Sequence, residues 1–232
     1  MVPRKKDFPS LNPDVISGGE DFFMDMKIII LKIGSSVLLT KRNKLDEFRI
    51  AHFARQIKFL KGKNYSIVLV VSGAVACGMD LISADQRDNN FRQLAAGIGQ
   101  AYLTSVFHQI FSKKHLHLAQ ILLTKEVFQL PDKSKKISCL FRSYLRLGVI
   151  PFVNENDAVD LNSFGGNDFL AKELIISLGA SQLLILSTMA GSVFGVGGGE
   201  TKQKVLSVLE GMNIKADIVD GKTQNIILKS II

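Results

Sequence analysis

From Lys27 onward, short apolar runs alternate with longer amphipathic stretches. The apolar runs are rich in Ile, Val and Leu and carry almost no polar positions, which is typical of parallel strands covered by helices on both faces. Six runs have the length of a strand: 27–33, 66–71, 117–123, 149–153, 182–187 and 216–219. The pattern therefore predicts an α/β fold with a mainly parallel sheet.

The stretches between these runs carry apolar residues at helical spacing. Helices are predicted over 45–61, 91–111, 168–178 and 201–209, and Gly179 is expected to end the third of them. Because no repeat and no Pro/Ser-rich linker interrupts the pattern, we expect one domain over residues 26–232. Residues 1–25 are polar, without periodicity and without the apolar core of a secretory signal, and we expect a disordered extension there.

Composition narrows the class of protein. With 47% hydrophobic residues the chain can fill one core, but no apolar run approaches the roughly 20 residues of a membrane helix. Two cysteines, Cys77 and Cys139, are too few for a disulfide framework, so a reducing, cytoplasmic compartment is expected. The four histidines lack metal-ligand spacing and are expected to be ordinary surface or core residues.

The formal charge of +8 favours anionic ligands. Part of the excess lies in short basic runs such as 133–136, which are typical of solvated faces. Aromatic and basic residues do not interleave as in RNA-binding motifs, so nucleic acid is not the expected partner.

Small and polar residues follow the predicted strands, where open parallel sheets bind ligands. Lys32 interrupts an otherwise apolar strand and is costly to bury unless an anion pairs with it. Gly34-Ser35-Ser36 is compatible with a phosphate cradle or a plain turn, and the same ambiguity holds for Ser72-Gly73. The segment 154–157 is either a polar turn or a substrate loop.

A second candidate anion site lies in the last third of the chain. The glycine-rich segment 195–199 precedes Thr201-Lys202, which opens a predicted helix. Backbone N–H groups at a helix start, together with a lysine, favour phosphate, although a glycine run alone is also compatible with a linker.

Taken in order, seven segments resemble the amino acid kinase family. They are LKIGSSV at 31–37, VSGAVACG at 71–78, LAAGIGQ at 94–100, AQILLT at 119–124, VNENDAV at 153–159, FGGND at 164–168 and GVGGGETK at 195–202. The resemblance implies a three-layer αβα sandwich with a mainly parallel central sheet. It also implies ATP- and Mg²⁺-dependent phosphorylation of the side-chain carboxylate of L-glutamate, the first step of proline biosynthesis. Family members commonly form homo-oligomers; the PUA domain that many of them carry is not expected here.

The resemblance also implies roles for individual residues. Lys32 and Lys202 would contact the transferred phosphoryl group from two sides, with Asp168 orienting them. Ser72, Asp157 and Asn167 match positions that bind glutamate. The residues implied at the nucleotide are Lys32, Gly34, Ser35, Thr188, Gly197, Gly198 and Lys202. No dedicated protein ligands for a metal are implied, since Mg²⁺ would be held chiefly by phosphates and water.

The sequence departs from the family pattern in the nucleotide half. Met189 stands where an aspartate is usual, only three residues (192–194) separate Gly191 from Gly195, and Gly166 replaces an acidic residue. Two readings follow: an active kinase with a shortened nucleotide site, or a weak or inactive relative that acts as a glutamate- or proline-binding regulatory protein. The presence of both Lys32 and Lys202 favours the active enzyme.

Overall fold

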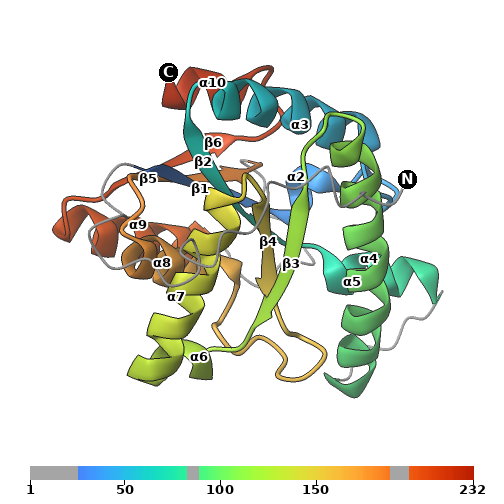
Figure 1. Cartoon of the computed structure of the whole chain (residues 1–232). Coiled ribbons are helices and arrows are strands. Elements are labelled where there is room, and N and C mark those ends of the chain that lie inside the picture. Colours follow the sequence, from blue (N-terminus) through green and yellow to red (C-terminus); the bar gives the residue numbers. More distant parts are fainter. Residues whose placement is uncertain (1–25, 83–88, 189–198) are drawn as a thin grey trace.

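A computed structural model describes residues 26–82, 89–188 and 199–232 (Figure 1). The predicted extension at 1–25 lies outside them. Six strands form one sheet in which every pairing is parallel, in the order β3-β4-β2-β1-β5-β6. The strands are β1 (Lys27–Ile33), β2 (Tyr65–Val71), β3 (Leu118–Leu123), β4 (Ile150–Glu155), β5 (Gln182–Ser187) and β6 (Lys215–Asp220).

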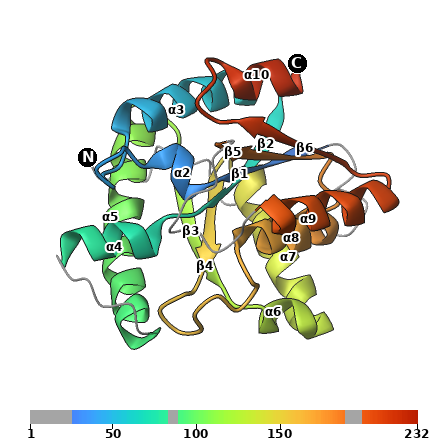
Figure 2. The ribbon, with the colours of Figure 1, turned by 180° about the vertical axis from the view of Figure 1, so that it is seen from behind.

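Helices cover both faces of this sheet (Figures 1 and 2). One face packs against α2 (Ser35–Leu38), α3 (Glu47–Gly62), α4 (Ala74–Leu81), α5 (Asn89–Ser112) and α10 (Ile226–Ile231). The other packs against α6 (Glu126–Gln129), α7 (Pro131–Arg146), α8 (Asn167–Leu178) and α9 (Gly199–Gly211). The predicted three-layer αβα sandwich is confirmed.

Alternation along β1 divides the core into two clusters. Ile29, Leu31 and Ile33 face α3 and α5, whereas Ile28 and Ile30 face α8 and α9. Side chains alternate between the two faces of a strand, so Lys32 lies on the same side as Ile28 and Ile30. The lysine is thereby directed toward α8 and α9.

Local sequence explains where the best-predicted helices begin and end. Asp46 caps α3, because its side chain accepts a hydrogen bond from the Arg49 N–H at 2.9 Å. Gly179 ends α8 as predicted; at φ +56° it adopts the left-handed conformation that favours glycine at a helix end. In the described ranges none of the helices has the length and hydropathy needed to cross a membrane.

The packing of α4 on α5 depends on two glycines. A Cβ on Gly78 would overlap the backbone of Ala95, and a Cβ on Gly99 would overlap the backbone of Ala74. Their absence allows the two helix backbones to approach closely. This contact places α5, with Gln100 on its buried side, next to the carboxyl ends of β2 and β4.

Candidate active site

The carboxyl ends of β1, β2, β4 and β5 meet at one edge of the sheet. The chain proceeds from β1 to β2 on one side, and β5 lies on the other side of β1, so the ends of β1 and β5 mark a topological switch point. The Gly34 N–H donates to the Leu186 carbonyl at 2.9 Å, and the Ser72 N–H donates to the Ile33 carbonyl at 3.0 Å. These bonds hold the loops that follow β1 and β2 against each other and against β5.

Three charged groups meet at the end of β1. Lys32 Nζ lies 2.7 Å from Asp168 Oδ1, and Lys202 Nζ lies 3.5 Å from Asp168 Oδ2. Lys32 and Asp168 are 5% and 1% exposed. The structure therefore brings together two lysines separated by 170 positions in the sequence, each bound to one oxygen of the same carboxylate.

The electrostatics of this triad favour a further anion. One buried carboxylate faces two ammonium groups, so the triad itself carries more positive than negative charge. Burial lowers the pKa of Lys32; Asp168 opposes that shift, and Lys202 adds to it. An anionic ligand would stabilise the charged form of both lysines.

Some of the residues implied at the nucleotide lie at the same edge of the sheet as this triad. Gly34 comes directly after β1, and a Cβ there would lie 3.3 Å from the Leu186 carbonyl oxygen and 3.9 Å from Lys32 Nζ. Ser35 begins α2, and Thr188 follows β5 at the same edge. Gly197 and Gly198 lie outside the described residues, as do the departures at Met189 and 192–194.

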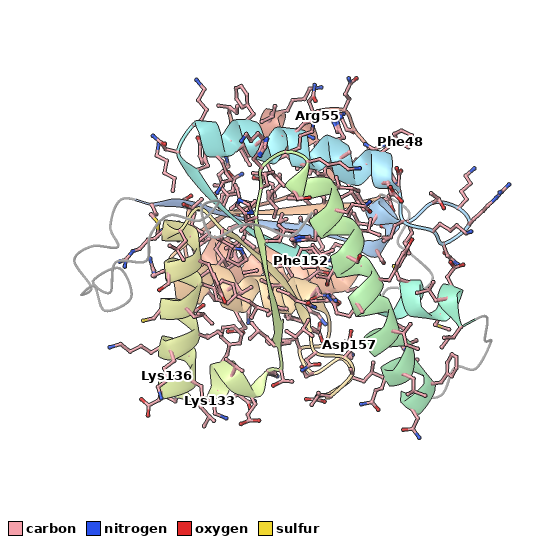
Figure 3. The ribbon with its side chains drawn as sticks, turned by 45° about the vertical axis from the view of Figure 1, so that its right-hand side comes forward. Phe48, Arg55, Lys133, Lys136, Phe152 and Asp157 are labelled. Carbon is pink, nitrogen blue, oxygen red and sulfur yellow. The ribbon has the colours of Figure 1, made fainter. Side chains whose placement is uncertain are left out.

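Two of the residues implied at the acceptor are in direct contact. Asn167 Nδ2 donates to Ser72 Oγ at 3.1 Å and to Asn154 Oδ1 at 2.8 Å. Asp157 is positioned differently: its Oδ1 accepts from the Asn162 N–H at 2.9 Å, and its side chain lies near the end of β4, beside α5 (Figure 3). Burial raises the pKa of Asp157, while the Asn162 N–H and Arg92 oppose that shift.

A cavity of about 220 Å³ adjoins Asp157. Helix α5 forms one wall, β3 another, and the segment that follows β4 a third. Its polar lining consists of Gln100, Gln120, Glu155, Asn156 and Asp157. The rest of the lining is small or apolar. Two carboxyl groups and three amides in such a lining suit a small cationic or zwitterionic group.

Glu155 was not singled out from the sequence. Strand β4 was predicted to end at 153 but continues to 155, so this carboxyl is 4% exposed. Its Oε2 accepts from the Phe164 N–H at 3.4 Å, and the nearby Gly166 N–H also favours the ionised carboxylate. Burial and Asp157 raise the pKa of Glu155 to about 7, against the effect of these N–H groups and Lys32. The signal in the sequence was the pair of polar residues, Asn154 and Glu155, that follows the apolar run 149–153.

Comparison with known proteins decides the family. The family model described as "Amino acid kinase family" matches residues 27–217. The chain belongs to the amino acid kinase family. Two relatives of this kinase-family chain are both named glutamate 5-kinase. One, from Streptococcus agalactiae serotype III (strain NEM316), is 33% identical over 73% of this chain and 66% of its own length. Another, from Streptococcus equi subsp. zooepidemicus (strain H70), is 34% identical over 73% of this chain and 65% of its own length.

The alignments thus span just under two thirds of the length of these curated relatives. Solved structures agree on the fold. An isopentenyl phosphate kinase superposes with a TM-score of 0.59 at 15% identity, covering 88% of this chain and 95% of that one. The UMP kinase from Ureaplasma parvum has a TM-score of 0.58 at 14% identity, with coverage of 89% and 95%. At these identities the likeness shows the amino acid kinase fold alone.

Proposed function

We propose that this chain transfers the γ-phosphoryl group of ATP to the side-chain carboxylate of L-glutamate, giving L-glutamyl 5-phosphate and ADP, the first step of proline biosynthesis. The observation that carries the proposal is the triad in which Lys32 and Lys202 share Asp168. Support also comes from the glutamate 5-kinase relatives and from the cavity beside Asp157, whose lining includes two carboxyl groups.

In the proposed reaction a carboxylate oxygen of glutamate attacks the γ-phosphorus while the bond from that phosphorus to the β–γ bridging oxygen breaks. The glutamate side chain is already ionised near neutral pH, since its ordinary pKa is about 4.3. No general base is therefore needed. What the step requires is the alignment of two anions and the neutralisation of their charge, which two converging ammonium groups supply.

Asp168 has a positioning role in this proposal. Two ammonium groups directed at one point repel each other, and the buried carboxylate between them holds both in place. The carboxylate also offsets part of the positive charge that the two lysines bring together. Asp168 thus prepares the site for phosphate without itself reacting.

On the acceptor side, Ser72, Asp157 and Asn167 are the proposed glutamate ligands. Both amide hydrogens of Asn167 are engaged by Ser72 and Asn154. Its Oδ1 accepts from the Glu155 N–H at 3.3 Å and has a second lone pair. Asp157 and this oxygen are the groups we expect to face the α-ammonium of glutamate.

On the nucleotide side, backbone N–H groups of Gly34 and Ser35 are proposed to contact phosphates, with Thr188, Gly197 and Gly198 completing the site. In the described ranges no three His, Cys, Asp or Glu side chains form a group that could hold a metal ion, and Asp168 already binds two lysines. Mg²⁺ is therefore proposed to enter as the MgATP complex, held by phosphates and water.

The test is a coupled assay of ADP release with L-glutamate, N-acetylglutamate, aspartate and UMP as acceptors. We expect turnover that depends on L-glutamate. A preference for UMP, or the absence of glutamate-dependent turnover, would refute the proposal. Calorimetry that finds glutamate binding without MgATP binding would favour the regulatory reading instead.

We also propose that the protein acts in the cytoplasm as a homo-oligomer. Helix α5 supports self-association, because Leu94, Ile98 and Tyr102 recur every four residues on its outer face and are 64%, 44% and 37% exposed. Both cysteines are free thiols, as a reducing compartment requires.

A further inference from the structure

A row of side-chain amides connects α5 to the acceptor residues. Gln100 Nε2 donates to Thr104 Oγ1 at 3.1 Å, and Asn154 Nδ2 donates to Gln100 Oε1 at 2.7 Å. Asn167 Nδ2 in turn donates to Asn154 Oδ1 at 2.8 Å and to Ser72 Oγ at 3.1 Å. We call Gln100, Asn154 and Asn167 the amide relay.

The orientation of the amide relay is determined by a backbone donor. The Glu155 N–H, which can only donate, lies 2.9 Å from Asn154 Oδ1 and 3.3 Å from Asn167 Oδ1. Asn154 must therefore direct its NH₂ group away from Asn167. Because Asn154 is only 1% exposed, that group needs a partner within the protein. Gln100 Oε1 accepts from that NH₂ group. Without this acceptor, Asn154 would have a buried donor without a partner, and this cost opposes the orientation in which its Oδ1 accepts from Asn167.

The amide relay ends at Ser72 and determines the role of its hydroxyl group. Because Ser72 Oγ accepts from Asn167, the hydroxyl hydrogen of Ser72 must point elsewhere. In the described parts of the chain, the bond from Asn167 is the hydrogen bond recorded for the Ser72 side chain, and Ser72 accepts in it. A carboxylate oxygen of a bound amino acid would supply an acceptor for the hydroxyl hydrogen.

We propose that Gln100 is a positioning residue of the acceptor site, acting through Asn154 and Asn167 to present the Ser72 hydroxyl as a donor to a carboxylate of the bound amino acid. The inference rests on the proposed function and adds to it a residue of α5. Gln100 is 7% exposed. Its carbonyl oxygen accepts from Asn154 and its amide nitrogen donates to Thr104, so the action proposed here reaches the ligand through Asn154.

The test is a double-mutant cycle of Gln100→Leu and Ser72→Ala, read as KM for L-glutamate, KM for MgATP and kcat. Gln100→Leu is expected to raise KM for L-glutamate about ten-fold, with kcat and KM for MgATP within about two-fold of the wild type. In the Ser72→Ala background the same change should alter KM by less than about two-fold, because the hydroxyl through which Gln100 acts is gone. If Gln100→Leu raises KM for L-glutamate by the same factor with and without the Ser72 hydroxyl, the two residues act independently and the proposal is overturned.

Gln56→Leu is the matched control. Gln56 is a second buried glutamine, 2% exposed, whose Oε1 accepts from the Ile227 and Leu228 N–H groups, away from the candidate site. It should lower the melting temperature without raising KM for L-glutamate, and an equal rise in KM would reduce Gln100 to a structural role. Should Gln100→Leu fail to fold, Gln100→Asn shortens the side chain by one methylene and is expected to give the same KM pattern.

Hydrogen exchange of the side-chain amides, measured by NMR, separates this inference from the proposed function. If the wild type shows no glutamate-dependent turnover, the proposed function fails while the relay is still tested. Slow exchange of the Asn167 side-chain amide in the wild type, accelerated in Gln100→Leu, supports the relay. Equal exchange in the two proteins overturns it.

Discussion

At the scale of single residues, the two lysines of the triad give the sharpest prediction. Lys32→Ala or Lys202→Ala should each lower kcat by about 10²-fold or more, since each removes a preorganised charge from the transferred phosphoryl group. Asp168 keeps one partner in either variant, so the fold should persist. Steady-state kinetics and circular dichroism measure the two effects.

Lys204→Ala is the control for this pair. Lys204 lies on the exposed side of α9, two positions after Lys202, and the substitution removes the same charge without touching Asp168. Its kcat should equal that of the wild type. Normal turnover in a folded Lys202→Ala variant would contradict the proposed role of the triad.

Glu155 gives a prediction for pH dependence. Its pKa is about 7 in the folded protein, against an ordinary value of 4.5 in the unfolded chain, so between these values the folded state binds more protons. Stability from this group is therefore complete below pH 4.5 and is lost as pH rises through 7. Glu155→Gln removes that loss, so the variant should gain up to about 3 kcal/mol relative to the wild type between about pH 5 and 8.

Urea denaturation at a series of pH values measures the difference in unfolding free energy between Glu155→Gln and the wild type. Titrating groups that the two proteins share contribute almost equally to both and largely cancel in this difference. The change of this difference with pH is the decisive quantity, because Gln can still accept the hydrogen bond from the Phe164 N–H that Glu155 accepts. A difference in unfolding free energy that stays constant over that pH range would show that the Glu155 carboxyl titrates outside it.

At the scale of elements, the exposed face of α5 gives a prediction for assembly. Ile98→Glu places a charge at the centre of the Leu94–Ile98–Tyr102 stripe, and the cost of burying it should convert an oligomer into a monomer. Light scattering coupled to gel filtration measures the mass. Gln109→Glu, farther along the same exposed side, should leave the mass unchanged. A monomeric wild type would refute self-association.

Strands and helices were predictable from the sequence where burial requires apolar residues. All six strands were found within two residues at either end, because a strand covered on both faces must be apolar throughout. Helix α7 was not predicted: its sequence, PDKSKKISCLFRSYLR, buries only Phe141 and Leu145, and its basic start resembles a loop. The end of β4 was missed because Asn154 and Glu155 are buried through hydrogen bonds, which an apolar pattern cannot show.

The candidate site was predictable in part for the same reason. Lys32 was conspicuous as a cation in an apolar strand, and the structure pairs it with Asp168. The link from Gln100 to Ser72 was not visible, since it joins residues from α5, β4, α8 and the loop after β2. Such contacts depend on the close packing of α4 on α5, which single positions in a sequence do not reveal.

At the scale of the whole molecule, β1 joins the two core clusters, since Ile30 faces one and Leu31 the other. If the described ranges form one domain, neither cluster can unfold alone, because both depend on the same strand. Unfolding should then follow one transition by near-UV and far-UV circular dichroism. Ile30→Ala and Leu31→Ala should each lower the free energy of unfolding by about 3 kcal/mol and keep the two signals coincident. A variant in which one signal is lost before the other would show that the two layers of helices fold separately.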